Sequence, residues 1–249
     1  MKKEIEKNEL DKNIFSLMYS KYTSNQAINS SAKIKLGSKT EKIFDARYSS
    51  FLPADLNAKI IDVGCGSGRM LEWLEKKGFK NIEGIDASEE QVSLAKKSTI
   101  AHVIKENINE WGFGVHKYEL ILLLDVLEHL SKPDAITLLQ KLREALKING
   151  KIIIQVPNCI SPFGLKIQYG DITHVTAYNE HSLSQLLRIS GFGQVKIHQW
   201  LIPIIDIKTL IRRALVSAIL KIIAVIYFIE TPRREIFTAN VIAVAQKIE

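Results

Sequence analysis

A chain of 249 residues, 46% of them hydrophobic, can bury a full core within one domain. Its charged fraction of 24% excludes wholesale disorder. The net charge of +7 suits anionic partners, but the lysines form no run with interleaved aromatic residues, so nucleic acid is not expected as a partner. One of only two cysteines, Cys65, lies in a glycine-rich segment. We therefore expect no structural disulfide and a cytoplasmic protein.

The predicted elements divide the chain into an N-terminal helical arm or lid, 1–55, and an alternating α/β domain, 56–249. Apolar spacing around 14–19 and 43–52 predicts two helices in the arm. In the α/β domain, short apolar runs predict strands at 59–63, 82–85, 101–104, 120–124, 152–156, 194–199 and 239–246. Helices are predicted at 67–78, 88–98, 132–148, 181–190 and 207–230, the last inserted between the final two strands. This alternation, with strands apolar on both faces, predicts a mostly parallel sheet with helices on both faces.

A glycine-rich turn joins the first predicted strand to the helix that follows. In "AKIIDVGCGSGRML", Gly64, Gly66 and Gly68 allow a sharp turn and a close approach of the backbone to a ligand. The helix directs its first N–H groups toward a polar or negative group. Asp86 ends the next strand about 20 residues later, where a carboxylate can accept both hydroxyls of a ribose. Together these features predict a site for an adenosine-containing cofactor.

The spacing of the glycines distinguishes between two adenosine-containing cofactors, S-adenosylmethionine (SAM) and NAD. A dinucleotide site has the pattern G-x-G-x-x-G, whereas this chain has G-x-G-x-G followed by Arg69. Arginine would obstruct the close packing of helix on strand that the last glycine permits. The pattern therefore favours SAM over NAD.

These segments resemble the class I SAM-dependent methyltransferases. "IIDVGCGSGRMLEWLEKKGF" and "NIEGIDASEEQVSLAKK" are similar to the first two motifs of that family, and "VIKENINEW" to the segment that meets adenine, although Asn107 stands where an aspartate is more usual. The resemblance implies a Rossmann-like fold with a seven-stranded sheet in the order 3-2-1-4-5-7-6 and an antiparallel last strand. It assigns cofactor binding to Asp62, Gly64, Cys65, Gly66, Ser67, Gly68, Asp86, Ala87, Asn107, Ile108 and Leu124.

The C-terminal third narrows the resemblance. "SPFGLKIQYGDITHVTAYNEHSLSQLLRISGF" is similar to bacterial methyltransferases that act in surface-polysaccharide (O-antigen-type) biosynthesis. This implies transfer to a hydroxyl of a glycan or of a sugar nucleotide. Two alternatives stay open: an O-methyltransferase of a small aromatic or quinone substrate, and a SAM-binding module that has lost catalysis.

Two clusters could remove the proton of an acceptor hydroxyl. Asp125, Glu128 and His129 follow the fourth strand at spacings that let them converge on Mg²⁺ or another divalent cation, as a similar set does in the quinone-biosynthetic relatives; the same residues could instead only line the pocket. Asp171 and His174 follow the fifth strand, whose carboxyl end faces the methyl acceptor in this fold. We predict that His174, supported by Asp171, is the base, with His129 as the next candidate.

The helical insertion is unusually apolar. Residues 208–230 read "KTLIRRALVSAILKIIAVIYFIE", with Lys221 interrupting an apolar stretch that is short for a membrane span. Flanking lysines and arginines would suit a helix lying on the inner face of an anionic membrane. A helix buried against the edge of the sheet, or in a homodimer interface, is the alternative.

Overall fold

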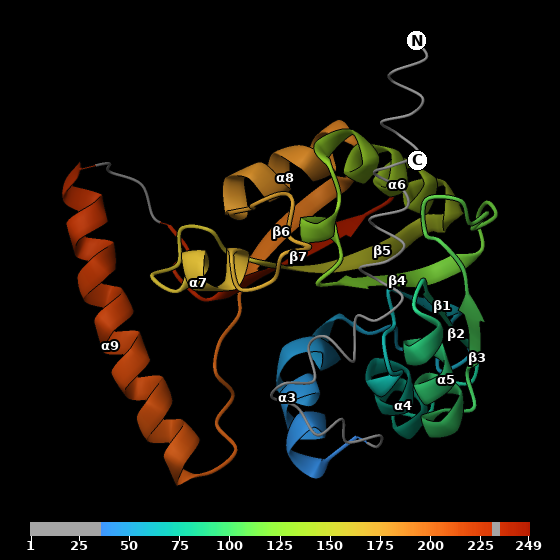
Figure 1. The fold of residues 1–249 in the computed structure, drawn as a ribbon, viewed down its shortest axis with the longest axis horizontal. Helices are drawn as coiled ribbons and strands as arrows, with labels where there is room; N and C mark the ends of the chain where they lie inside the picture. Colours follow the sequence, from blue (N-terminus) through green and yellow to red (C-terminus); the bar gives the residue numbers. More distant parts are fainter. Residues whose placement is uncertain (1–35, 231–234) are drawn as a thin grey trace.

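The computed structural model describes residues 36–230 and 235–249, which form a single seven-stranded sheet with helices on both faces (Figure 1). The strand order is β3-β2-β1-β4-β5-β7-β6. Pairing is parallel from β3 to β5, and β7 is antiparallel to both β5 and β6. The predicted fold class, strand order and antiparallel last strand are confirmed. The strands are β1 (Ile60–Val63), β2 (Ile82–Asp86), β3 (His102–Lys105), β4 (Tyr118–Leu124), β5 (Leu146–Pro157), β6 (Gly193–Gln199) and β7 (Asn240–Gln246).

The helices lie close to their predicted positions. They are α3 (Ser38–Tyr48), α4 (Arg69–Lys76), α5 (Glu89–Ser98), α6 (Lys132–Ala145), α7 (Gly164–Gln168), α8 (Glu180–Ile189) and α9 (Ile207–Glu230), with short 3₁₀ turns η1 (Ser49–Phe51) and η2 (Leu127–His129). The short helix α7 was not predicted, because five residues carry too little periodicity. The helix predicted around 14–19 lies outside the described residues.

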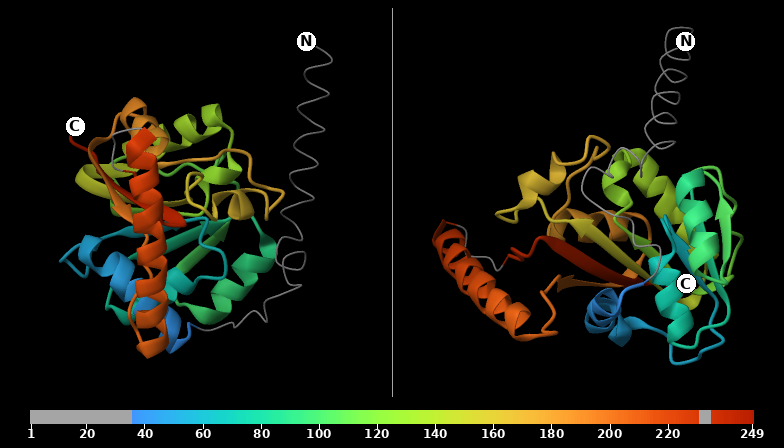
Figure 2. Two further views of the ribbon diagram at one scale, coloured as in Figure 1. Left: turned by 90° about the vertical axis from the view of Figure 1, so that its left-hand side faces the viewer. Right: turned by 60° about the horizontal axis from the view of Figure 1, so that its bottom comes forward.

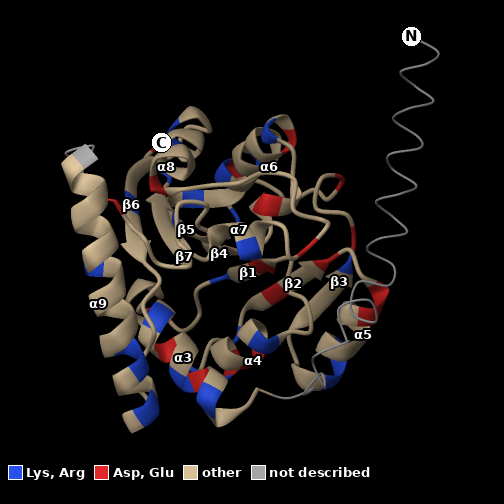
Figure 3. Cartoon of the chain, turned by 60° about the vertical axis from the view of Figure 1, so that its left-hand side comes forward, with Lys and Arg blue, Asp and Glu red and all other residues tan. Residues whose placement is uncertain are grey.

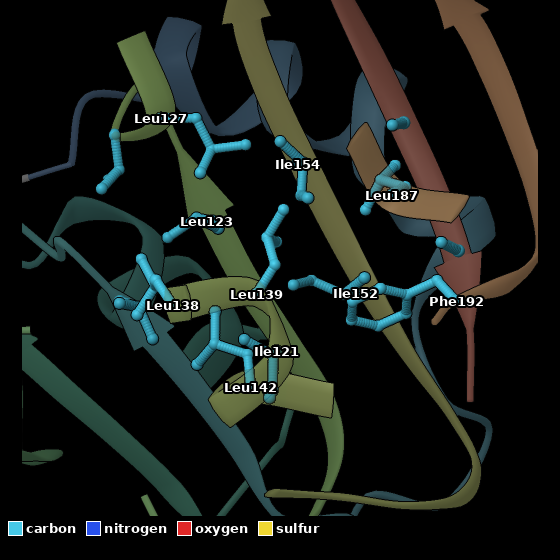
Figure 4. Packing of buried hydrophobic residues seen from close by; sticks show 14 of the residues in the cluster. Ile121, Leu123, Leu127, Leu138, Leu139, Leu142, Ile152, Ile154, Leu187 and Phe192 are labelled. Atoms are coloured by element: carbon cyan, nitrogen blue, oxygen red, sulfur yellow. The ribbon is translucent and has the colours of Figure 1, made fainter. Parts of the chain in front are cut away.

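Side chains of the central strands point alternately into two hydrophobic cores, one on each face of the sheet. Ile121 and Leu123 point toward α6 and α8, where they pack with Leu138, Leu139 and neighbouring residues (Figure 4). Leu120 and Leu122, which alternate with them along β4, belong to a cluster on the other face with residues of α3 and α4. Both faces are buried, as expected of strands without alternating polarity.

The order of the strands determines where a ligand site can form. The chain passes from β1 to β2 and β3 on one side of β1, and then crosses to β4 on the other side. In an open α/β sheet, ligands bind outside the carboxyl ends of the strands at such a reversal. The parallel strands β1 to β5 all end at this edge, and the predicted site residues lie at the ends of these strands or in the segments that follow them.

Candidate cofactor and methyl-transfer site

The glycine-rich turn after β1 is left-handed at each of its three glycines. Gly64, Gly66 and Gly68 have φ angles of 78°, 51° and 80°. A Cβ at Gly64 would lie 2.5 Å from Cγ2 of Val126, and one at Gly68 would lie 3.0 Å from Cβ of Ala95. These two glycines therefore allow the turn to pack against the segment after β4 and against α5.

Gly66 has a different environment. The nearest atom to a Cβ placed there, apart from chain neighbours, is Oε1 of Gln91 at 3.7 Å. The protein itself thus leaves room above Gly66, as a turn that receives a ligand must. Its N–H donates a hydrogen bond of 2.8 Å to Oδ2 of Asp86, while Oδ1 of the same carboxylate accepts from the N–H of Ser88, also at 2.8 Å.

Asp86 is therefore held in a defined orientation beside the turn. Burial raises the pKa of its carboxyl group, and the two backbone hydrogen bonds act in the opposite direction. Each carboxylate oxygen has a second lone pair available for a ribose hydroxyl. Ala87, next in the chain, is exposed.

Two further residues of the turn have structural contacts. The buried Cys65 packs with Leu71 of α4 and Val92 of α5, and burial raises the pKa of its thiol, so it is neutral. The carbonyl oxygen of Ser67 accepts from the hydroxyl of Ser98 at 3.0 Å. The side chain of Cys65 is therefore turned into the core, and only its backbone is expected to meet the cofactor.

The remaining residues predicted to bind the cofactor lie after β3 and at the end of β4. Asn107 is exposed after β3, and its Oδ1 accepts from the N–H of Asn109 at 3.0 Å. Ile108 packs against the core on the α6 side, and the half-buried Leu124 ends β4. Their contact with the cofactor stays a prediction.

Asp62 lies within β1, directly before the turn, and is only 3% exposed. Burial, and then the negative charge of Asp86, raise the pKa of Asp62 to about 7. A carboxylate at this position would attract the ammonium group of SAM, whereas a protonated carboxyl group would not.

This shift predicts a pH dependence of cofactor binding. Below pH 7 the unliganded protein holds Asp62 protonated, and binding of a cation then requires the proton to leave. SAM affinity, measured by calorimetry, should rise about fivefold from pH 6 to 7.5, before the α-amino group of SAM loses its own proton at a pKa of about 7.7–8.0. Asp62→Asn should remove the slope; an unchanged slope in that variant would assign the titration to another group.

Beyond β4, Asp125 belongs to a hydrogen-bonded network that was not predicted from the sequence. It is left-handed, with a φ of 55°, and its N–H donates to the carbonyl of Gln155 on β5 at 2.9 Å. Oδ2 of Asp125 accepts from Nε2 of Gln155 at 2.8 Å. Oε1 of Gln155 accepts from the hydroxyl of Tyr48 at 2.6 Å and from Nε1 of Trp200 at 2.7 Å. A buried glutamine within the apolar run "KIIIQVP" was the available signal.

Arg47 lies against this network from α3. Its guanidinium carbon is 3.5 Å from the centre of the Trp200 ring. Nε of Arg47 is buried without a hydrogen-bond partner among the described residues. Burial lowers the pKa of Arg47 to about 10, although the nearby Tyr48 and Asp125 act in the opposite direction. The arginine stays charged at neutral pH and can meet an anionic or hydroxyl-rich group.

Glu128, His129 and His174 form a second cluster, in which one donor atom from each lies within 4.8 Å of the others. Glu128 is 1% exposed, and Oε2 has no hydrogen-bond partner among the described residues. Burial, and then Asp125, raise the pKa of Glu128 well above its usual range. The rings of His129 and His174 meet edge to face with centres 4.8 Å apart. The cluster thus brings His174, rather than the predicted Asp125, together with Glu128 and His129.

Thr173 links Asp171 to His129. Its hydroxyl donates to Oδ1 of Asp171 at 2.6 Å and lies 2.8 Å from Nδ1 of His129. Nδ1 of His129 also lies 3.3 Å from the backbone carbonyl oxygen of Thr173. Since the hydroxyl proton of Thr173 is given to Asp171, both oxygens of Thr173 can only accept from Nδ1–H, and Nε2 carries the lone pair. Burial, and then His174, lower the pKa of His129, so its imidazole is neutral at neutral pH.

His174 has no comparable support. Its Nδ1 is buried without a hydrogen-bond partner among the described residues. The predicted support of this ring by Asp171 therefore does not come from a hydrogen bond to Nδ1. Thr173 was not predicted as a site residue, because a threonine in a loop has no distinctive signal in the sequence.

A family model of the methyltransferase domain matches residues 37–197, well over half of the chain. The ubiquinone biosynthesis O-methyltransferase of Actinobacillus pleuropneumoniae serotype 7 is 28% identical over 113 residues, which cover 40% of this chain and 46% of that protein. The corresponding protein of Hydrogenovibrio crunogenus is 29% identical over 108 residues, 41% of this chain and 44% of its own. The chain thus spans a little under half the length of the curated relatives that it matches.

Solved structures show the same fold. A SAM-dependent methyltransferase from Archaeoglobus fulgidus aligns with a TM-score of 0.62 at 19% identity, over 84% of this chain and 94% of that one. Phosphoethanolamine N-methyltransferase 2 of Haemonchus contortus, in complex with SAM, aligns with a TM-score of 0.59 at 15% identity, over 86% of this chain and 53% of that one. From the family match and the shared fold, this chain belongs to the methyltransferase domain family and has the fold of the SAM-dependent methyltransferases.

Proposed function

We propose that this protein transfers the methyl group of SAM to a hydroxyl group of a small molecule, with a glycan or sugar nucleotide as the preferred acceptor class. One observation carries the proposal: the contact of Gly64 with Val126 joins the cofactor turn directly to the segment that bears His129. A cofactor bound at the turn would therefore lie beside a neutral imidazole at the same edge of the sheet.

The chemistry is an in-line displacement. Nε2 of His129 accepts the proton of the acceptor hydroxyl as its oxygen forms a bond to the methyl carbon. The bond from that carbon to the sulfonium breaks, and S-adenosylhomocysteine leaves with the electron pair. Thr173 and Asp171 stabilise the imidazolium, which later gives its proton to water.

The network around Asp125 supports a polar acceptor. Arg47, Trp200 and Asn240 contribute a cation, an aromatic face and an amide, the kinds of group that bind sugars and their acidic substituents. A phenol or quinol is the second candidate, because the curated relatives include ubiquinone biosynthesis O-methyltransferases.

The decisive experiment offers methyl-labelled SAM and two acceptor panels to the purified protein, one of sugar nucleotides and glycans and one of phenols and quinols. Mass spectrometry should detect a product with one added methyl group in the sugar panel. Methylation in the phenol and quinol panel alone would show that the acceptor is a phenol or quinol and not a sugar. SAM binding without transfer to any acceptor in either panel would support a binding module without catalysis.

A divalent cation is a separate question. Glu128, His129 and His174 supply one carboxyl oxygen and two imidazole nitrogens, a set that fits a transition metal better than Mg²⁺. Such an ion would polarise the acceptor oxygen. Nε2 of His129 can take the proton of the acceptor without a metal ion, because Thr173 and Asp171 already orient the ring. We therefore expect the transfer rate to persist in excess chelator.

The control for this prediction measures binding directly. Calorimetric titration of Mg²⁺ and Mn²⁺ into wild type and Glu128→Gln should give no heat that depends on Glu128. Loss of transfer in chelator, restored by Mn²⁺, together with Glu128-dependent Mn²⁺ binding, would instead establish a metal site.

A further inference from the structure

Helix α9 stands apart from the sheet. Figure 1 and the right-hand view of Figure 2 both show it separated from the body of the protein. Its contacts include a hydrogen bond of 3.4 Å from Arg213 Nη1 to the carbonyl of Ile202 and the ring of Tyr227 against Phe237. The alternative of a helix buried against the edge of the sheet is therefore wrong for this chain.

The face of α9 that points to solvent is apolar. Residues at spacings of three and four form one stripe, which we call the outer stripe: Ile211, Leu215, Ala218, Ile222, Val225 and Ile229. All six are exposed, with Leu215 and Ile222 at 62% and Ile229 at 80%. The half-buried Val216, Leu220 and Ile223 lie on the opposite face. A soluble monomer would show the reverse arrangement, so the outer stripe calls for an apolar partner.

The charges on α9 identify that partner. Lys208, Arg212 and Lys221 are exposed and flank the outer stripe, and 207–229 contains no acidic residue. Figure 3 accordingly shows blue and no red along the described part of the helix. Cations beside an apolar stripe match the headgroups of anionic lipids, with their aliphatic stems along the acyl boundary.

Two other arrangements fit less well. None of the described helices is long and apolar enough to cross a bilayer, which leaves an in-plane helix. In a two-fold dimer of outer stripes, Lys221 near the middle of one helix would approach Lys221 of the other, with no acid within 207–229 to pair with it.

We propose that α9 lies in the plane of an anionic membrane surface, with the outer stripe at the acyl boundary and the flanking cations among the lipid headgroups. The helix is inserted between Trp200 and Asn240, which hydrogen-bond to Gln155 and Asp125 of the acceptor network. Binding through α9 would thus place the acceptor side of the site next to the membrane.

The test is co-sedimentation of the full chain with vesicles of phosphatidylcholine, alone or with about 30% phosphatidylglycerol. The wild type should sediment with the vesicles that contain phosphatidylglycerol and should not sediment with those of phosphatidylcholine alone. Removing each of Lys208 and Arg212 should lower the partition coefficient about fivefold.

A matched pair of variants isolates the outer stripe. Leu215→Glu with Ile222→Glu places two acids on it, and Ser217→Glu with Ala224→Glu places two acids at the same spacing on the half-buried side. The first should bind mixed vesicles at least tenfold more weakly than the second, with circular dichroism and thermal unfolding confirming that both fold. Equal losses in the two variants, or no wild-type binding, would overturn the proposal. The proposal would also be overturned if the wild type did not bind vesicles but formed a dimer in light scattering, and if Leu215→Glu with Ile222→Glu disrupted that dimer.

Discussion

Replacing His129 with asparagine should lower the turnover number by roughly 10²–10⁴ and leave SAM affinity within about twofold of wild type. The asparagine amide can occupy the place of Nδ1 and still donate to Thr173, but nothing replaces Nε2. The variant therefore removes the proton acceptor while preserving the contact that positions it. Turnover is measured with an acceptor found in the two panels described above, and SAM affinity by calorimetry.

Comparison with His174 makes the result specific. His174→Asn removes a ring of the same kind, 4.8 Å away, that lacks the Thr173 and Asp171 support. If His129 is the base, this variant should lose much less, and mainly through KM. The reverse pattern, with His174→Asn falling by the larger factor, would restore the prediction made from the sequence.

Thr173 is a positioning residue, and its role can be separated from a purely structural one. Thr173→Val keeps the shape but removes the hydroxyl that joins Asp171 to His129. The turnover number should fall about 10–100-fold with KM nearly unchanged, since one hydrogen bond to a charged group contributes about 1.5–3 kcal/mol. Thr173→Ser should recover most of the loss. A valine variant with full turnover would exclude the link.

Local signals were sufficient for the sheet and the cofactor turn. Strands that are apolar on both faces, separated by amphipathic helices, leave few topologies other than a covered parallel sheet. The three glycines lie within five residues, and Asp86 lies one strand further, so spacing alone could place them together. The strand β5 extends to Leu146 rather than beginning at 152, because backbone pairing with Tyr118 does not need an apolar run.

The acceptor side could not be predicted in the same way. Tyr48 and Gln155 are 107 residues apart, and Thr173 and His129 are 44 apart, so neither contact follows from any periodicity. Similarly, a helical repeat shows that α9 is apolar but not which face the rest of the chain covers. These features depend on where loops return to the sheet, which is decided by packing across the whole domain.

Replacing Asp86 with alanine should weaken SAM binding more than about a hundredfold. Two ribose hydroxyls would lose a charged acceptor, at about 1.5–3 kcal/mol for each hydrogen bond. The N–H groups of Gly66 and Ser88 would lose the same carboxylate, so the cofactor turn would also be less well ordered. Calorimetry with SAM and S-adenosylhomocysteine gives the loss for both forms of the cofactor.

The matched control is Glu89→Ala, which removes an exposed carboxylate from the first turn of α5, close to Asp86 in sequence. Asp86→Ala could lose affinity only because a negative charge near the sulfonium of SAM is removed. In that case Glu89→Ala would lose a comparable factor in SAM affinity, and it would lose none in affinity for S-adenosylhomocysteine, whose sulfur is uncharged. Hydrogen bonding to the ribose instead predicts that Asp86→Ala weakens both ligands by similar factors, because both carry the same ribose. Unchanged affinity in Asp86→Ala, or tight binding of NAD by the wild type, would remove the cofactor assignment on which the proposed reaction depends.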